Sequence, residues 1–226
     1  MSTEVSTTNN VMPQMYEAVD NSDRQLPSVY LLQGLSQAVQ NGIGKSGEVI
    51  VGLGADDPHP TFLIGGDSGN DSFTAYILDR RRSYARFEQG GQMEWLTKEE
   101  YDEARANRER DVWVNHHYTI CVPEVDETVP MRLMLSRTAG LKPSKALNFL
   151  IDKSLAMGQI PVAEFSVGEG TSRTTGAKYA TLQVSATEGD PEGAAVAANQ
   201  QSYFTASVNA AEDTAKITAG DQPDFW

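Results

Sequence analysis

FTAYILDRRRSYARFE, residues 73–88, separates into two chemically distinct faces when it is written as an extended strand. The separation follows because successive side chains of a strand point to opposite sides of the sheet. One face is mostly small or apolar, and it contains Phe73, Ala75, Ile77, Asp79, Arg81, Ser83, Ala85 and Phe87. We expect this face to lie on a hydrophobic core.

The other face of the same strand is aromatic and basic, and it contains Thr74, Tyr76, Leu78, Arg80, Arg82, Tyr84 and Arg86. Aromatic rings stack on nucleobases and guanidinium groups bind phosphates, so this face predicts a solvent-facing platform for single-stranded nucleic acid. A solvated strand whose arginines merely lie over its tyrosine rings has the same pattern. The remainder of the chain has to separate these two interpretations.

The segments around this strand predict a mainly β chain. Strands are expected at residues 47–53, 61–64, 117–124, 128–138, 160–167 and 173–186, which are rich in β-branched and apolar residues. Within residues 128–138, Met131, Leu133 and Leu135 are expected to point inward. Arg132, Met134 and Ser136 then point outward.

Helices are expected at three places, one before the first of these strands and two between later ones. Part of residues 26–42 forms one short helix, and a surface helix runs from Thr97 to about Arg110, with a capping box between Thr97 and Glu100. A packed helix covers residues 141–158, with Pro143 at its start and Gly158 at its end. Its apolar face contains Leu147, Leu150, Ile151 and Leu155.

This order of elements is that of an oligonucleotide-binding (OB) fold. We therefore expect an OB-like Greek-key barrel with a helical insert and a packed helix before its last two strands; an all-β sandwich stays open. The expected organisation is a flexible N-terminus (1–24), the OB-like domain (25–187), a polar linker or helix (188–218) and an acidic tail (219–226).

The charge of the chain is unevenly distributed. Its 226 residues carry a net charge of -13, yet residues 129–187 hold seven basic and three acidic residues. The segment 73–87 holds four arginines against one aspartate. An acidic protein whose basic residues lie in the expected sheet differs from a uniformly acidic one, so nucleic-acid binding is not excluded.

Other classes of protein are disfavoured by what the sequence lacks. It has no apolar run long enough for a membrane span and no signal peptide at its N-terminus. Its single cysteine, Cys121, excludes an internal disulfide and a cysteine-based zinc site, and it is expected to be a buried thiol in a reducing compartment.

No catalytic motif is visible. The sequence contains no phosphate-binding GxxxxGK[ST] loop, no GxSxG and no HExxH. Asp56, Asp57 and His59 lie among glycine and prolines that favour a turn over a metal site, and His116 and His117 are adjacent and point to opposite faces of a strand. We expect a protein that is not an enzyme, with no metal and no cofactor.

The last eight residues, AGDQPDFW, place two acids before a terminal aromatic pair: Asp221, Asp224, Phe225 and Trp226. Together with the domain order, this ending resembles bacterial and phage single-stranded DNA-binding proteins, which have an OB-fold, a polar linker and an acidic tail with a terminal aromatic residue. The segment LPSVYLLQGLSQAVQNG, residues 26–42, is similar to the start of such proteins from tailed phages of enterobacteria. The tail departs from the family in having only two acids and an additional tryptophan.

The resemblance implies sequence-tolerant binding and protection of single-stranded DNA during phage DNA replication and recombination in the host cytoplasm. The expected DNA-binding residues are Tyr76, Arg80, Arg82, Tyr84 and Arg86, with Arg132, Arg173, Lys178 and Tyr179 as secondary candidates. Asp221, Asp224, Phe225 and Trp226 would recruit replication or recombination proteins.

Two alternatives stay open: a phage protein-interaction or structural module without nucleic-acid binding, and an RNA-binding OB-fold protein. The oligomeric state, a homodimer included, is also open.

Overall fold

The computed structural model describes residues 26–34, 36–53, 57–87, 93–172 and 176–202. Three predicted features lie outside these residues. They are the expected flexible N-terminus, the secondary candidate Arg173, and the C-terminal tail with Asp221, Asp224, Phe225 and Trp226.

The described chain is mainly β, as expected. Its nine-stranded sheet has the order β3-β2-β1-β7-β6-β4-β8-β9, and β5 pairs with β4. All neighbouring strands are antiparallel except β1 and β7, which are parallel. The strands are β1 (Ser28–Leu31), β2 (Val49–Gly52), β3 (Thr61–Ile64), β4 (Ser72–Phe87), β5 (Met93–Leu96), β6 (Val112–Cys121), β7 (Met131–Ser136), β8 (Val162–Thr171) and β9 (Lys178–Ala186).

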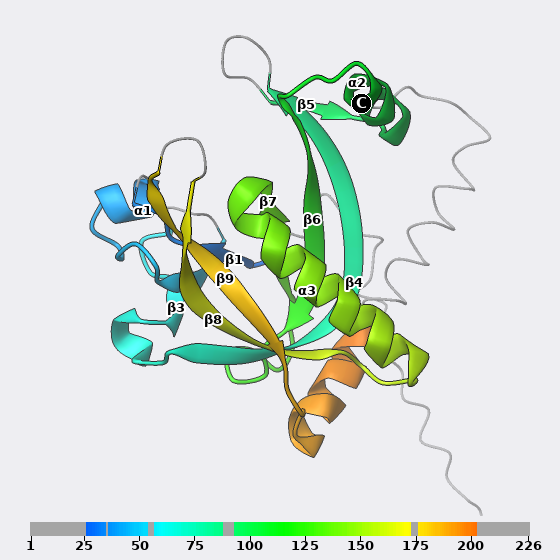
Figure 1. Cartoon of the computed structure of the whole chain (residues 1–226). Coiled ribbons are helices and arrows are strands. Elements are labelled where there is room, and N and C mark those ends of the chain that lie inside the picture. The colour runs from blue at the N-terminus through cyan, green and yellow to red at the C-terminus, as the bar shows by residue number, and fades with distance from the viewer. Residues whose placement is uncertain (1–25, 35, 54–56, 88–92, 173–175, 203–226) are drawn as a thin grey trace, which may run out of the picture. The chain divides into compact units, whose positions relative to one another are not determined.

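The sheet curls into a half-barrel (Figure 1). The side chain of Gln33, just after β1, donates from Nε2 to the carbonyl oxygen of Ala180 at 2.9 Å. The backbone N–H of Ala180 in turn donates to Gln33 Oε1 at 3.2 Å. Since β1 and β9 are far apart in the order of the strands, these two bonds close part of the gap between them.

The helices lie largely where the sequence predicts them, although α3 begins at Arg137, so Pro143 lies inside it and not at its start. They are α1 (Gln37–Gln40), a 3-10 turn η1 (Gly66–Ser68), α2 (Lys98–Ala106), α3 (Arg137–Ala156) and a helical stretch at residues 191–202. Segment 26–42 contains the short helix α1 and also strand β1, which forms from its first part. Helix α2 is the expected insert, and α3 precedes the last two strands.

The main core lies between the sheet and α3. Met131, Leu133 and Leu135 of β7 point into it as expected, and Leu147, Leu150 and Ile151 of α3 cover it. Leu155 was expected on the same face but is 59% exposed. Leu155 instead lines a hollow beside the core together with Leu78 and Ile160.

A β-bulge at Leu78 reverses the two faces of β4. Ile77 pairs with Ile120 and Asp79 pairs with Thr119, so two residues of β4 oppose one residue of β6. Such an extra residue moves every later side chain to the other face. The prediction of one continuous core face is therefore right for Phe73, Ala75 and Ile77 and wrong beyond the bulge.

Before the bulge, the face predicted to be exposed is covered. Tyr76, Leu78 and Cys121 form a second apolar cluster with Ala197 of the helical stretch 191–202. Tyr76 is 2% exposed, and its hydroxyl donates to the carbonyl oxygen of Asp190 at 3.0 Å. The expected solvent-facing Tyr76 is thus wrong, because residues 191–202 fold as a helix over it.

Candidate nucleic-acid interface

Beyond the bulge, β4 and β6 continue together towards β5 and α2 (Figure 1). We call this part of the sheet the arm, and it comprises residues 79–87 of β4, residues 112–119 of β6, and β5. Its inner face lies on the side of α3, because Arg80 pairs with Tyr118 and Tyr118 belongs to the core. Arg80, Arg82, Tyr84 and Arg86 share this inner face, so four of the five predicted primary residues are together.

Arg80 lies against α3. Its guanidinium forms an ion pair with Asp152 at 2.7 Å. Beside it, the Tyr118 hydroxyl donates to the carbonyl oxygen of Ser144 and to Asn148 Oδ1, both at 3.3 Å. Burial raises the pKa of Tyr118 to about 12, so this hydroxyl stays protonated and fixes β6 to α3.

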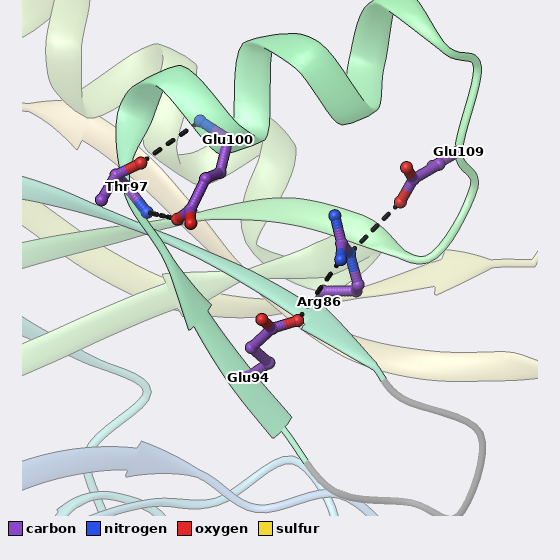
Figure 2. A network of polar contacts seen from close by, with 5 residues as sticks. All are labelled: Arg86, Glu94, Thr97, Glu100 and Glu109. Carbon is purple, nitrogen blue, oxygen red and sulfur yellow. Dashed lines mark hydrogen bonds and ion pairs between the residues drawn. The ribbon is translucent and has the colours of Figure 1, made fainter.

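Arg86 lies at the other end of the inner face, where Figure 2 shows it between two carboxylates. It pairs with Glu94 of β5 at 3.4 Å and with Glu109, beyond α2, at 3.2 Å. A phosphate would have to displace both carboxylates to reach this guanidinium. Arg86 therefore connects parts of the arm and is poorly placed to bind DNA.

Helix α2 begins with the predicted capping box (Figure 2). The backbone N–H of Glu100 donates to Thr97 Oγ1 at 3.2 Å, and the backbone N–H of Thr97 donates to Glu100 Oε2 at 2.7 Å. The hydrogen bond from the Thr97 N–H to the Glu100 carboxylate holds the pKa of Glu100 below its ordinary value. This cap orients α2 over the tip of the arm.

Tyr84 supports α2 instead of facing solvent. Its ring lies 4.8 Å from that of Tyr101, and both rings pack against the cluster of Leu96, Ala104 and Val112. Only part of the Tyr84 ring is left exposed, so the expectation of a free stacking ring is wrong here too. Local alternation does not reveal α2 as its partner.

Arg82 lies in the middle of the inner face and is exposed. Within the described ranges it makes no ion pair. Its neighbour across the strands is His116, whose pKa is lowered by burial and by the charges of Arg82 and His117. Lys145, two turns before Asp152 on the same side of α3, adds an exposed cation.

The edge of β4 is open between two neighbouring strands. On the side away from β6, residues 72–76 pair with β8 and residues 84–87 pair with β5. Among the described residues, 79–83 pair with β6 alone. Arg80, Arg81 and Arg82 lie on this open edge; Arg80 and Arg82 point to the inner face and Arg81 to the outer one.

The described secondary candidates do not lie on the inner face of the arm. Arg132 lies on the outer face of the sheet, beside Thr119. Lys178 pairs with Glu169 at 2.9 Å, and Tyr179 packs over Gly170, where a Cβ would come within 2.5 Å of its ring. Both residues belong to β9 and pair with the last residues of β8. The first residues of β8 are the ones that pair with β4, so Lys178 and Tyr179 do not join the arm.

The outer face of the arm contains functional candidates that the sequence did not single out. Trp95 and Phe87 are 55% and 38% exposed, and Met134 of the neighbouring β7 is 50% exposed on the same side of the sheet. The sequence signal for this face was the alternation of Trp113, Asn115, His117 and Thr119 in β6. In a strand, such alternation puts all four side chains on one face of the sheet.

The remaining expectations concern metals, membranes and the thiol. Asp57 accepts hydrogen bonds from the N–H groups of His59 and Leu53, which lower its pKa and make it a turn residue. In the described part of the chain, no cluster of His, Cys, Asp or Glu could hold a metal, and no helix is long and apolar enough to span a membrane. Cys121 is fully buried, as expected.

Comparison of the chain with protein-family models, curated proteins and solved structures finds no match in any of the three.

Proposed function

We propose that this protein binds single-stranded DNA without sequence preference and without catalysis, through an OB-like barrel. The observation that carries the proposal is the open edge of β4, where three consecutive arginines face both sides of the sheet. A phosphate backbone that crosses this edge meets a guanidinium group on either face. In a chain with a net charge of -13, such a local concentration of cations favours an anionic ligand.

The three arginines would contribute unequally. Arg82 is exposed and makes no ion pair in the described ranges, whereas Arg80 is paired with Asp152 and Arg81 with Asp79 at 2.9 Å. A phosphate gains most at Arg82, where no carboxylate must be displaced. Lys145 lies across the inner face and extends the cationic path towards α3.

Charged residues on an open strand edge have a second explanation. They prevent other chains from pairing with the edge, whatever the protein binds. That explanation predicts no dependence of DNA affinity on Arg82, so the two can be separated by measurement.

The role in phage replication and recombination, in the host cytoplasm, belongs to the same proposal and comes from the resemblance of the tail. Asp221, Asp224, Phe225 and Trp226 would recruit partner proteins, since an apolar pair flanked by acids suits a shallow apolar pocket with a basic rim.

One observation favours the alternative of a protein-interaction module. A groove of about 970 Å³ runs beside α3 and is lined by Phe149, Met157, Ile160 and Val184. Phe149 and Met157 are 74% and 54% exposed in this groove, and apolar residues exposed together mark interaction surfaces. A module of this kind would not need the arginines of β4.

The test is a titration of the full-length protein with oligo-dT at several salt concentrations, with oligo-rU and a duplex as competitors. Affinity should fall log-linearly with salt, by about 0.7 in slope for each phosphate contact. Arg82→Gln should lower that slope by about one contact. Lys45→Gln is the matched control, because it removes one exposed cation outside the arm.

Absence of oligo-dT binding would reject the proposal. Binding that Arg82→Gln and Lys45→Gln reduce equally would reject the open edge as the site. Preference for oligo-rU would favour the RNA-binding alternative.

A further inference from the structure

The outer face of the arm has aromatic and cationic side chains at successive levels of the sheet. At the tip, Trp95 and Trp113 lie on either side of Ala85. Four residues further along β4, Arg81 lies beside His117, and at the next level of this face Thr119 lies beside Arg132. Directly paired residues of antiparallel strands point to the same face, so these groups share one surface.

Two of the three rings at the tip, Trp113 and Phe87, are held in place before any ligand binds. Trp113 donates from its indole N–H to Asn115 Oδ1 at 3.0 Å, and Asn115 is only 2% exposed. Phe87 lies 5.3 Å from the Trp113 ring at 37°. Ala85 between the two tryptophans adds no bulk, and Trp95 remains 55% exposed. Rings that are already fixed lose little entropy when a base stacks on them.

The same face carries positive charge away from the rings. Arg132 is exposed and forms no ion pair with any described residue. His117 is held by Ser83 through an Oγ···Nε2 hydrogen bond of 2.7 Å. Burial and the charge of Arg132 lower its pKa, so at neutral pH it presents an uncharged ring beside Arg132.

The distance along the face suits a polymer. From Ala85 to Asp79 is six residues of strand, or about 20 Å at 3.3 Å per residue. The rings lie at one end of this length and Arg132 at the other. An extended chain with alternating flat and anionic groups can contact both, whereas one small molecule cannot.

We propose that the outer face of the arm is the base-stacking surface for single-stranded nucleic acid, with Trp95 and Phe87 as stacking rings and Arg132 as a phosphate contact. The proposal rests on the proposed function and deepens it, because it names where the bases lie. A strand that crosses the open edge at Arg80, Arg81 and Arg82 reaches this face directly. Single-stranded nucleic acid fits better than an apolar partner, since the exposed rings share the face with Arg132.

Tryptophan fluorescence of the full chain tests the proposal. The sequence has three tryptophans, so Trp226→Phe leaves only Trp95 and Trp113, both on the outer face. Oligo-dT should quench the fluorescence of this protein as bases stack. In the same background, Trp95→Ala should weaken oligo-dT binding by about 10- to 100-fold, and Trp95→Phe should restore most of the affinity.

Phe149→Ala is the matched control, because it removes a more exposed ring from α3, outside the arm. It should bind oligo-dT as tightly as its background, and circular dichroism of all variants should match. Binding without quenching, or a Trp95→Ala protein that binds within twofold of its background, overturns the stacking surface but not the proposed function. Absence of binding by every protein overturns both.

Sedimentation of the same proteins tests whether a second copy of this chain, and not nucleic acid, binds the outer face. If Trp95→Ala converts a dimer to a monomer, the outer face joins two copies of this chain and the stacking proposal fails.

Discussion

Three consecutive arginines of β4 have different electrostatic surroundings although they are identical in sequence. Arg80 pairs with Asp152 across the inner face, and Arg81 pairs with Asp79 two residues earlier on the outer face. Arg82 follows them and has His116 as its cross-strand neighbour. The free energy that each arginine gains from binding a phosphate depends on whether it must first break an ion pair with a carboxylate. Residue type alone does not rank them.

Tyr76 shows the same dependence on surroundings. It is an aromatic residue in a basic strand, yet Gly189 and Gly193 pack so closely on its ring that a Cβ at either position would lie 2.7 Å from its hydroxyl oxygen. Burial raises its pKa, and nearby Asp190 adds to this effect. Tyr76 is therefore a core residue that joins β4 to the chain after β9.

We predict that Tyr76→Ala lowers the free energy of unfolding by about 3–5 kcal/mol, because it leaves a cavity under the helical stretch. Tyr76→Phe should cost about 1 kcal/mol, because it removes only the hydrogen bond to Asp190. Urea denaturation measures both. The oligo-dT affinity of the folded Tyr76→Phe protein should equal that of the parent. A loss of affinity without a loss of stability would mean that Tyr76 contributes to the DNA site.

At the scale of elements, β4 belongs to two environments. Residues 72–76 pair with β8, and Phe73, Ala75 and Tyr76 among them are buried, whereas residues 79–83 pair with β6 alone among the described residues. The bulge at Leu78 separates the two parts and turns Arg80 and Arg82 towards α3. One strand thus contributes to the core at one end and to the candidate site at the other.

This division explains which elements the sequence could predict. The capping box of α2 depends on Thr97 and Glu100 alone, and the inward face of β7 depends on a clean alternation, so both were confirmed. The bulge was not visible, because residues on both sides of Leu78 alternate equally well in either register. The partners of Tyr84 and Arg86 come from α2, its following turn and β5, which the periodicity of β4 cannot locate.

Arg86 provides a prediction at this scale. Arg86→Gln removes ion pairs to Glu94 and Glu109, which hold β5 and the end of α2 to β4. We expect a loss of about 0.5–1 kcal/mol in the free energy of unfolding, since partly exposed ion pairs contribute modestly. The salt dependence of oligo-dT binding should stay nearly unchanged.

The contrast with Arg82 is the decisive comparison. Arg82→Gln should change the salt slope and leave the urea midpoint close to that of the parent. If Arg86→Gln lowers the slope as much as Arg82→Gln does, Arg86 releases its glutamates and binds phosphate, and the assignment of a supporting role is wrong.

At the scale of the whole molecule, the segment after β9 is part of the folded body. Residues 191–202 cover the outer side of β4 at Tyr76 and Leu78, and Gln200 donates from Nε2 to the carbonyl oxygen of Asp126 at 3.2 Å. The sequence left this segment open as linker or helix, because small and polar residues give it no broad apolar stripe. Its small residues, such as Ala194 and Ala197, allow it to approach the sheet closely.

The single thiol of the chain reports whether this cover is in place. Cys121 is fully buried in the cluster beneath residues 191–202, and burial raises its pKa to about 11. A buried thiol with a raised pKa is a poor nucleophile, because little of it is present as thiolate.

We predict that the full-length protein reacts slowly with a disulfide reagent such as DTNB at pH 8. A chain ending at Thr187 should react many times faster, whereas one ending at Ser202 should react as slowly as the full chain. Near-ultraviolet circular dichroism shows whether the shorter chain keeps its core, so that faster reaction can be attributed to local exposure. Equal rates for all three chains would mean that residues 188–202 do not protect Cys121 and that the fold of residues 26–187 is independent of them.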